Sequence, residues 1–235
     1  MAYPFVTLIL APLLLWQGRQ VRRITPRLPE AAGERDGRAG NGTPLRLLIA
    51  GDSAAAGVGA QHQHEALSGQ LTAALAGRYT VHWQLVATTG HTLTDVMQTL
   101  EQMPAAAFDV VVTSIGVNDA TAGTGLSPWI TRHSRLLCLL QEKFGAQHVV
   151  LSAVPPMQHF PALPQPLRWY MGWRARRLNA ALAAFAARNS NVTLVQAEFP
   201  LDAEFIASDG FHPAPAAYAL WAAQLAKAIE QNRAH

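Results

Sequence analysis

The sequence lacks most features that cross-link a chain, bind metal or recognise nucleic acid. Its 235 residues include one cysteine, Cys138, so no internal disulfide can form. Only 14% of the residues are charged, and no long basic stretch is interleaved with aromatic residues, which argues against nucleic acid as a partner. His62 and His64 lie two residues apart, but no carboxylate or cysteine cluster completes a metal site beside them. We therefore expect no metal.

Nucleotide-binding motifs are also missing. The glycine-rich residues 51–59 lack the Gly-Lys-Ser/Thr ending of a phosphate-binding loop, and their glycine spacing does not match the dinucleotide fingerprint. Nor do they contain Gly-x-Ser-x-Gly, the turn that carries the nucleophile in α/β-hydrolases. We therefore expect no cofactor.

Half of the residues are hydrophobic, which is enough for one domain with a substantial core. From about residue 45 onward, short apolar runs alternate with longer segments of helical period. The expected strands are residues 47–50, 80–87, 108–115, 149–154 and 192–195, and the expected helices are residues 65–75, 93–103, 128–144, 168–189 and 213–233. This alternation predicts an α/β protein built on a parallel five-stranded sheet.

The N-terminal segment is apolar and ends in positive charge. Residues 2–16 are almost wholly apolar, and Arg19, Arg22 and Arg23 follow them. This run is shorter than the ~20 residues of a spanning helix, and its arginines follow rather than precede it, unlike those of a secretory signal. Three interpretations stay open: an anchor that contacts a membrane surface through residues 2–24, a segment packed on the domain's own apolar surface, and a cleaved signal.

The arginines also bear on localisation, because positive charge tends to stay on the cytoplasmic side of a membrane. We expect a protein that is membrane-associated with its domain on the cytoplasmic side, or cytoplasmic, rather than periplasmic or secreted. Residues 25–44 are rich in proline and glycine and show no apolar period, so they are predicted to be a linker. The chain then divides into an apolar segment at 1–24, this linker, and one domain at 45–235. No feature of the sequence specifies an oligomeric state.

Polar residues follow three of the predicted strands. Ser53, the Gly90 loop and Asn118 each come soon after the end of one strand. Because the carboxyl ends of parallel strands meet at one edge of a sheet, where ligands bind, we expect these residues to converge. Ser53 is the candidate nucleophile, although a serine in a strand-to-helix turn is also typical of a helix cap.

A carboxylate and an imidazole lie at the entrance of the last predicted helix. The spacing of Asp209 and His212 allows the carboxylate to accept from Nδ1 while Nε2 points at a serine, as a general base requires. His212 would then deprotonate Ser53. The amides of Ser53 and Gly90 and the side-chain amide of Asn118 are candidates for an oxyanion hole.

These residues, taken in chain order, resemble the SGNH subgroup of the GDSL esterase and lipase superfamily. The matching blocks are Gly51-Asp52-Ser53-x-x-x-Gly57, the Gly90 loop, Gly116-x-Asn118-Asp119 and Asp209-x-x-His212. The resemblance spans about residues 45–232 and implies a flavodoxin-like three-layer α/β/α sandwich. It also implies that Ser53 is the nucleophile, that Asp209 and His212 support it, and that Gly90 and Asn118 complete an oxyanion hole with the Ser53 amide. Ala54 departs from the family pattern, which has leucine there.

We therefore expect a serine hydrolase that cleaves carboxylic esters or thioesters through an acyl-enzyme on Ser53. The expected substrate is a small acyl ester or a lipid-like ester. Two alternatives are a carbohydrate O-deacetylase of the same fold and a catalytically inactive, membrane-tethered binding module. Asp52 and Asp119 are expected to brace loops through hydrogen bonds rather than to transfer protons.

Overall fold

In the part of the chain that the structure describes, six strands form one sheet in the order β1-β3-β2-β4-β5-β6. The computed structural model describes residues 3–197, 200 and 202–233. Strands β2 to β6 run parallel, and β1 pairs antiparallel with β3 at the edge. Their bounds are β1 Asp36–Ala39, β2 Thr43–Gly51, β3 Tyr79–Ala87, β4 Val110–Ser114, β5 His148–Ser152 and β6 Val192–Val195.

The five predicted parallel strands are all present, and their order β3-β2-β4-β5-β6 is that of a flavodoxin-like sheet. The predicted strand count is too low by one, because β1 lies inside the segment that was expected to be a linker. Its sequence, Asp-Gly-Arg-Ala, is exposed and has no apolar alternation. Backbone pairing with β3, from Asp36 opposite Gln84 to Ala39 opposite Val81, holds it in the sheet. Residues 36–39 are therefore part of the folded domain.

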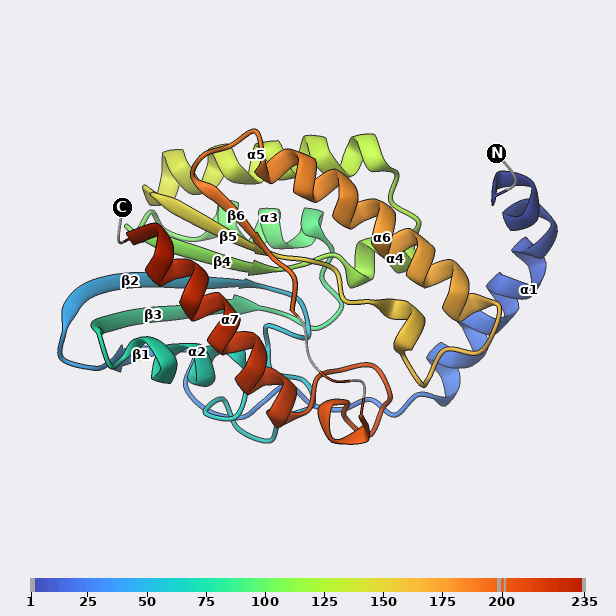
Figure 1. Cartoon of the computed structure of the whole chain (residues 1–235), viewed down its shortest axis with the longest axis horizontal. Helices are drawn as coiled ribbons and strands as arrows, with labels where there is room; N and C mark the ends of the chain where they lie inside the picture. The colour runs from blue at the N-terminus through green and yellow to red at the C-terminus, as the bar shows by residue number, and fades with distance from the viewer. Residues whose placement is uncertain (1–2, 198–199, 201, 234–235) are drawn as a thin grey trace.

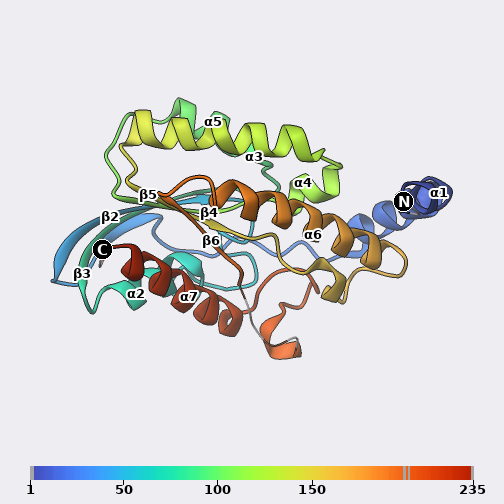
Figure 2. The ribbon, with the colours of Figure 1, turned by 45° about the horizontal axis from the view of Figure 1, so that its top comes forward.

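Helices cover both faces of the sheet (Figures 1 and 2). Helices α2 (Leu67–Leu75) and α7 (Pro215–Arg233) pack on one face. Helices α3 (Leu93–Gln102), α5 (Leu126–Phe144) and α6 (Leu167–Ala186) pack on the other. The three layers agree with the expected α/β/α sandwich.

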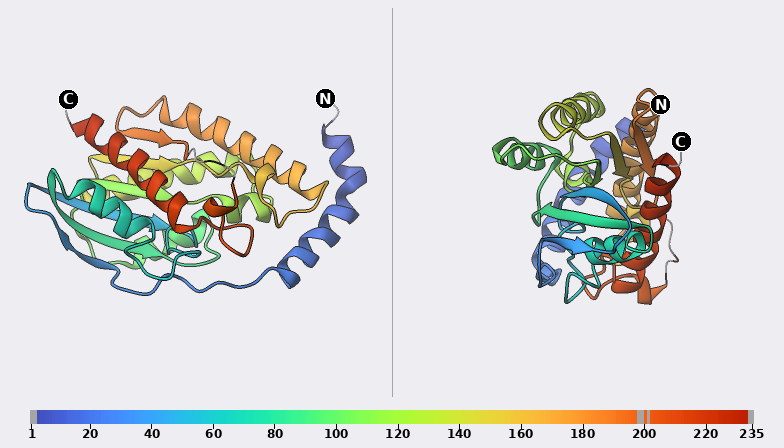
Figure 3. Two further views of the ribbon diagram at one scale, coloured as in Figure 1. Left: turned by 60° about the horizontal axis from the view of Figure 1, so that its bottom comes forward. Right: turned by 90° about the vertical axis from the view of Figure 1, so that its left-hand side faces the viewer.

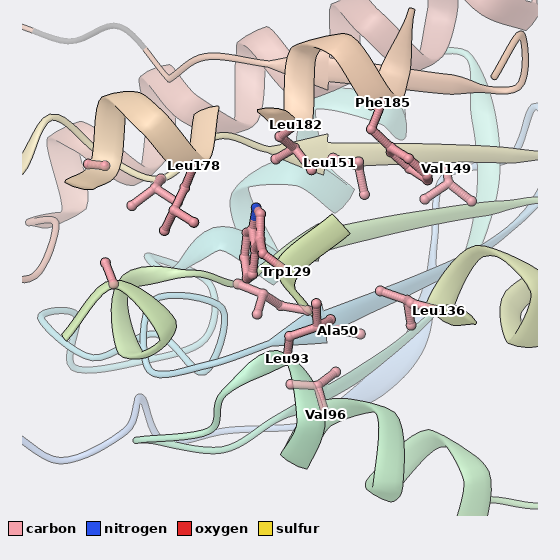
Figure 4. Close-up of a cluster of buried hydrophobic side chains, with 14 of the residues drawn as sticks. Ala50, Leu93, Val96, Trp129, Leu136, Val149, Leu151, Leu178, Leu182 and Phe185 are labelled. Atoms are coloured by element: carbon pink, nitrogen blue, oxygen red, sulfur yellow. The ribbon is translucent and has the colours of Figure 1, made fainter. Parts of the chain in front are cut away.

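The core explains why β2 reads as a continuous apolar run. Both faces of a parallel sheet are covered, so successive residues of its inner strands are all buried. Leu47 and Ile49 join the cluster under α2 and α7, whereas Leu48 and Ala50 join the opposite cluster. Figure 4 shows the second cluster, in which Trp129 of α5 lies between side chains of α3 and α6.

Shorter elements complete the chain: α4 Val117–Ala122, η1 Met157–His159 and η2 Ala203–Phe205. The N-terminal helix α1, Tyr3–Ile24, lies beside the start of α6, and its first half extends away from the body of the molecule (Figure 3). Leu14 and Val21 of α1 are buried in the core. Within the part of the chain that the structure describes, no helix is both long and apolar enough to span a membrane.

The order of the strands fixes where a site can form. The chain leaves β2 toward β3 on one side and returns to β4 on the other, so a crevice opens beyond the carboxyl ends of β2 and β4. Gly51 at the end of β2 lies opposite Ser114 at the end of β4. The segments that carry Ser53 and Asn118 begin directly after this pair.

Candidate active site

The turn after β2 holds Ser53 close to the end of β4. The amide of Asp52 donates to the carbonyl of Ser114 at 3.0 Å, which continues the β2–β4 pairing by one residue. Gly51 is needed here because a Cβ at that position would lie 2.3 Å from the Ser114 carbonyl oxygen. Gly57 has a φ of +86° and leaves no room for a side chain between Ala31 and Ala66. Close packing against the β4 backbone explains Gly51, and the positive φ together with two alanine methyl groups explains Gly57.

Ser53, His212 and Asp209 form a continuous hydrogen-bonded chain. Ser53 Oγ lies 2.8 Å from His212 Nε2, and His212 Nδ1 lies 2.5 Å from Asp209 Oδ2. With the ring proton on Nδ1, the imidazole donates to the carboxylate and accepts the serine proton at Nε2. The structure thus brings together the three residues that the sequence predicted as nucleophile, base and orienting carboxylate.

Asp209 is held in place by more than the imidazole. Its Oδ1 accepts hydrogen bonds from the amides of Phe211 and His212 at 2.9 and 3.0 Å. Burial would raise the pKa of this carboxyl, since 2% of its side chain is exposed, but the hydrogen bonds from His212 and Phe211 outweigh burial and lower the pKa. Asp209 therefore faces His212 as an anion, which stabilises a protonated imidazole.

Gly90 occupies a tight turn after β3. The amide of His91 donates to the carbonyl of Thr88, and Gly90 has a φ of +88° at the third position, as in a type II turn. Asn118 lies next to this turn, because its Nδ2 donates to the His91 carbonyl at 2.9 Å. Among the described residues, the amides of Ser53 and Gly90 have no intramolecular acceptor. Both N–H groups are available to an oxyanion.

Two carboxylates brace the loops, as the sequence predicted. Asp119 accepts from the amide of Leu93 at 2.9 Å, which ties α4 to the segment that follows Gly90. Asp52 accepts from the amide of Ala54 at 3.1 Å, within the Ser53 turn. Burial raises the pKa of both carboxyls, and that of Asp52 reaches about 7.

Sequence reasoning missed the contacts that hold the Gly90 turn from its other side. Glu30 Oε1 accepts from both the amide and the hydroxyl of Thr89, at 2.7 and 2.8 Å. Arg35 pairs with Glu30 Oε2 at 2.6 Å and donates to the Ala87 carbonyl at 2.7 Å. Both residues lie in the segment that was expected to be a linker, where nothing in the local pattern marks them as structural.

A cavity of about 990 Å³ opens at these residues. Ser53, Gly90, Asn118 and His212 all line it, whereas Asp209 lies behind the imidazole. The remaining lining is largely apolar and comes mainly from α1, from the segments after β4 and β5, from α6 and from the segment before α7. It includes Leu14, Ile115, Phe160, Leu163, Leu167 and Phe211. The cavity can therefore hold an apolar group next to the Ser53 hydroxyl.

The sequence matches the model of one known protein family. Residues 49–220 match the model of the GDSL-like lipase/acylhydrolase family. The chain belongs to this family. The match covers the Ser53 turn, the Gly90 turn, Asn118 and the Asp209–His212 pair, so this GDSL hydrolase is an enzyme of the esterase and acylhydrolase type. No curated protein sequence matches the chain.

Solved structures agree with this fold. A lipolytic protein of the G-D-S-L family from Veillonella parvula is 15% identical, with a TM-score of 0.62 over 79% of this chain and 98% of that one. The psychrotrophic esterase EstA from Pseudoalteromonas sp. is 19% identical, with a TM-score of 0.60 over 81% and 100%. A carbohydrate esterase family 2 enzyme from Corynascus thermopiles is 16% identical, with a TM-score of 0.65 over 88% and 69%.

The first prediction concerns Asp52. Burial raises the pKa of the Asp52 carboxyl in the folded GDSL hydrolase from its ordinary 3.8 to about 7, so the free energy of unfolding falls as pH rises between these two values. Asp52→Asn keeps an acceptor for the Ala54 amide and removes this fall. Urea denaturation at several pH values measures this. The free energy of unfolding of the variant, relative to that of the wild type, should rise by at most about 1.4 kcal/mol per pH unit and should rise no further above about pH 8. Exposed Asp36→Asn is the control, and parallel curves for Asp52→Asn and the wild type would contradict the assignment.

The second prediction concerns Glu30. Glu30→Ala removes the acceptor for Thr89 and frees the turn that presents the Gly90 amide. Because loss of a whole oxyanion donor costs about 100-fold or more in kcat, a loosened donor should cost roughly tenfold, with a smaller change in KM. Steady-state kinetics on a soluble ester measure this. Exposed Glu34→Ala should leave kcat unchanged, and an equal loss in both variants would rule out a specific role for Glu30.

Proposed function

We propose that this GDSL hydrolase cleaves carboxylic esters or thioesters through an acyl-enzyme on Ser53. The observation that carries the proposal is the hydrogen-bonded chain from Ser53 Oγ through His212 to Asp209, which opens onto the apolar cavity. Each group has the partner that its role requires. Such an arrangement activates a hydroxyl that is a weak nucleophile by itself.

In the acylation step, Ser53 Oγ attacks the carbonyl carbon of the ester while His212 Nε2 takes the hydroxyl proton. The negative charge that develops on the carbonyl oxygen is stabilised by the amides of Ser53 and Gly90 and by Asn118 Nδ2. The bond between the carbonyl carbon and the leaving oxygen or sulfur then breaks. His212 returns its proton to that leaving group, and the acyl group stays on Ser53.

Deacylation repeats the sequence with water. His212 Nε2 removes a proton from a water molecule as the water oxygen attacks the acyl carbon. The bond to Ser53 Oγ breaks, His212 reprotonates that oxygen, and the carboxylic acid leaves. Asp209 remains ionised throughout and stabilises the imidazolium of both steps, which fits the lowered pKa of this carboxyl.

The cavity lining favours an apolar acyl chain over an acetyl group alone. Phe160 and Phe211 pack edge to face, with ring centroids 5.6 Å apart, and both line the cavity. Arg168 holds the segment around them by donating to the carbonyls of Pro161 and Leu163. An acetyl group would leave most of this apolar surface exposed to water. A longer acyl chain would bury it, which contributes ~25 cal/mol of binding free energy per Å² of apolar surface.

The third prediction tests the nucleophile and the acyl preference together. Ser53→Ala should lower kcat for p-nitrophenyl esters by about four to six orders of magnitude, because the covalent route is lost. The wild type should show kcat/KM rising from acetyl to longer acyl chains. Esterase assays with circular dichroism as a folding check measure both.

Ser134→Ala, on the exposed side of α5, is the control and should retain full activity. A Ser53→Ala variant that is folded and keeps more than a few per cent of the rate would exclude Ser53 as the nucleophile. A strong preference for acetyl esters on acetylated sugars would instead favour the carbohydrate O-deacetylase alternative.

A further inference from the structure

Helix α1 has two faces with different environments. Leu14, Gln17 and Val21 are buried against the body of the protein. The Gln17 side chain fixes this contact, because its Nε2 donates to the Gln165 carbonyl at 2.8 Å and its Oε1 accepts from the Leu167 amide at 3.1 Å. The second half of α1 is therefore a fixed part of the domain rather than a free tail.

A second face of α1 is apolar and exposed. Ile9, Leu13 and Trp16 recur at the i, i+4, i+7 spacing of one helix face, and their exposed fractions are 78%, 40% and 57%. In the described part of the chain, the large hydrophobic side chains that stay exposed all lie on α1, apart from Leu220. A contiguous apolar stripe on a projecting helix is typical of a surface that is covered in use.

Charge indicates what covers this face. Arg19, Arg22, Arg23 and Arg27 follow the apolar stripe and are all exposed, and the first acidic residue of the chain is Glu30. An apolar face with a tryptophan, followed by a cluster of arginines and no acidic residue, matches the interface of a bilayer that contains anionic lipid.

Helix α1 also forms one wall of the substrate cavity. Leu14, Leu15, Arg19 and Arg22 line the same cavity as Ser53. Leu14 is buried there, and Leu15, Arg19 and Arg22 reach the rim of the cavity while remaining exposed, whereas Ile9, Leu13 and Trp16 do not line it. Part of the helix therefore lies between the cavity and whatever contacts the face that carries Ile9, Leu13 and Trp16.

We propose that helix α1 docks this protein on an anionic lipid surface through Ile9, Leu13, Trp16 and the arginines that follow. The docked helix places the cavity beside the bilayer, so that lipid esters of that bilayer reach Ser53. The docking stands on the surface of α1 alone. The delivery of lipid esters rests in addition on the proposed ester hydrolysis.

The fourth prediction tests the docking by cosedimentation of the full chain with vesicles. The wild type should bind vesicles of phosphatidylglycerol and phosphatidylcholine at low salt, bind pure phosphatidylcholine weakly, and dissociate at about 0.5 M salt. Arg23→Gln with Arg27→Gln should weaken binding ~30-fold, because each arginine near an anionic surface contributes about fivefold. Neither arginine lines the cavity. Trp16→Asp should also weaken binding.

Matched controls carry the same changes elsewhere. Arg38→Gln with Arg135→Gln alters the net charge equally, and Leu220→Asp places a carboxylate at an exposed apolar site of α7. Both should bind vesicles like the wild type. The proposal is overturned if the wild type does not bind anionic vesicles or if the controls lose binding equally. It is also overturned if the wild type instead forms a dimer that Trp16→Asp dissociates.

Hydrolysis of p-nitrophenyl butyrate without vesicles separates this proposal from the proposed function. The α1 variants named above should retain that activity. Vesicle binding without any ester hydrolysis would support the docking and contradict the enzymatic mechanism. Ester hydrolysis without vesicle binding would overturn the docking and leave the mechanism standing.

Discussion

The hydrogen bond between Ser53 Oγ and His212 Nε2 joins two residues that are 159 positions apart in the chain. It forms because the parallel sheet brings the end of β2 to the edge where the segment before α7 returns. Both residues are held by neighbouring backbone hydrogen bonds. Next to Ser53, the Asp52 amide continues the pairing with β4, and on the other side Asp209 accepts hydrogen bonds from the amides of Phe211 and His212. The geometry of this pair therefore depends on the whole sheet.

The proposed oxyanion hole depends on a different constraint: the Gly90 turn is held between the side chains of Asp119 and Glu30. Asp119 binds the chain just after the turn, and Glu30 binds Thr89 within it. A donor that is fixed before substrate arrives needs no reorganisation when charge develops, and this preorganisation is the main source of electrostatic catalysis. The N-terminal residues thus contribute to the candidate site: Glu30 supports the turn, and α1 forms part of the cavity wall.

The parallel strands could be predicted because strands buried on both faces appear as continuous apolar runs in the sequence. The site residues could be predicted because ligands bind at the carboxyl ends of parallel strands. The family model matches residues 49–220, which contain all four motif blocks. Strand β1 could not be predicted, because an exposed edge strand of Asp-Gly-Arg-Ala has no burial pattern and is selected by backbone pairing alone. The role of Glu30 could not be predicted either, since its partner Thr89 is 59 residues away and an isolated glutamate carries no local signal.

The most direct test of the account is to label the active site with an alkyl fluorophosphonate and locate the adduct by peptide mass spectrometry. This reagent phosphonylates a serine only when an adjacent base activates it. The account predicts a single adduct per chain, on Ser53, and a strongly reduced labelling rate in His212→Ala. An adduct on another residue, or labelling of Ser53 that does not depend on His212, would contradict it.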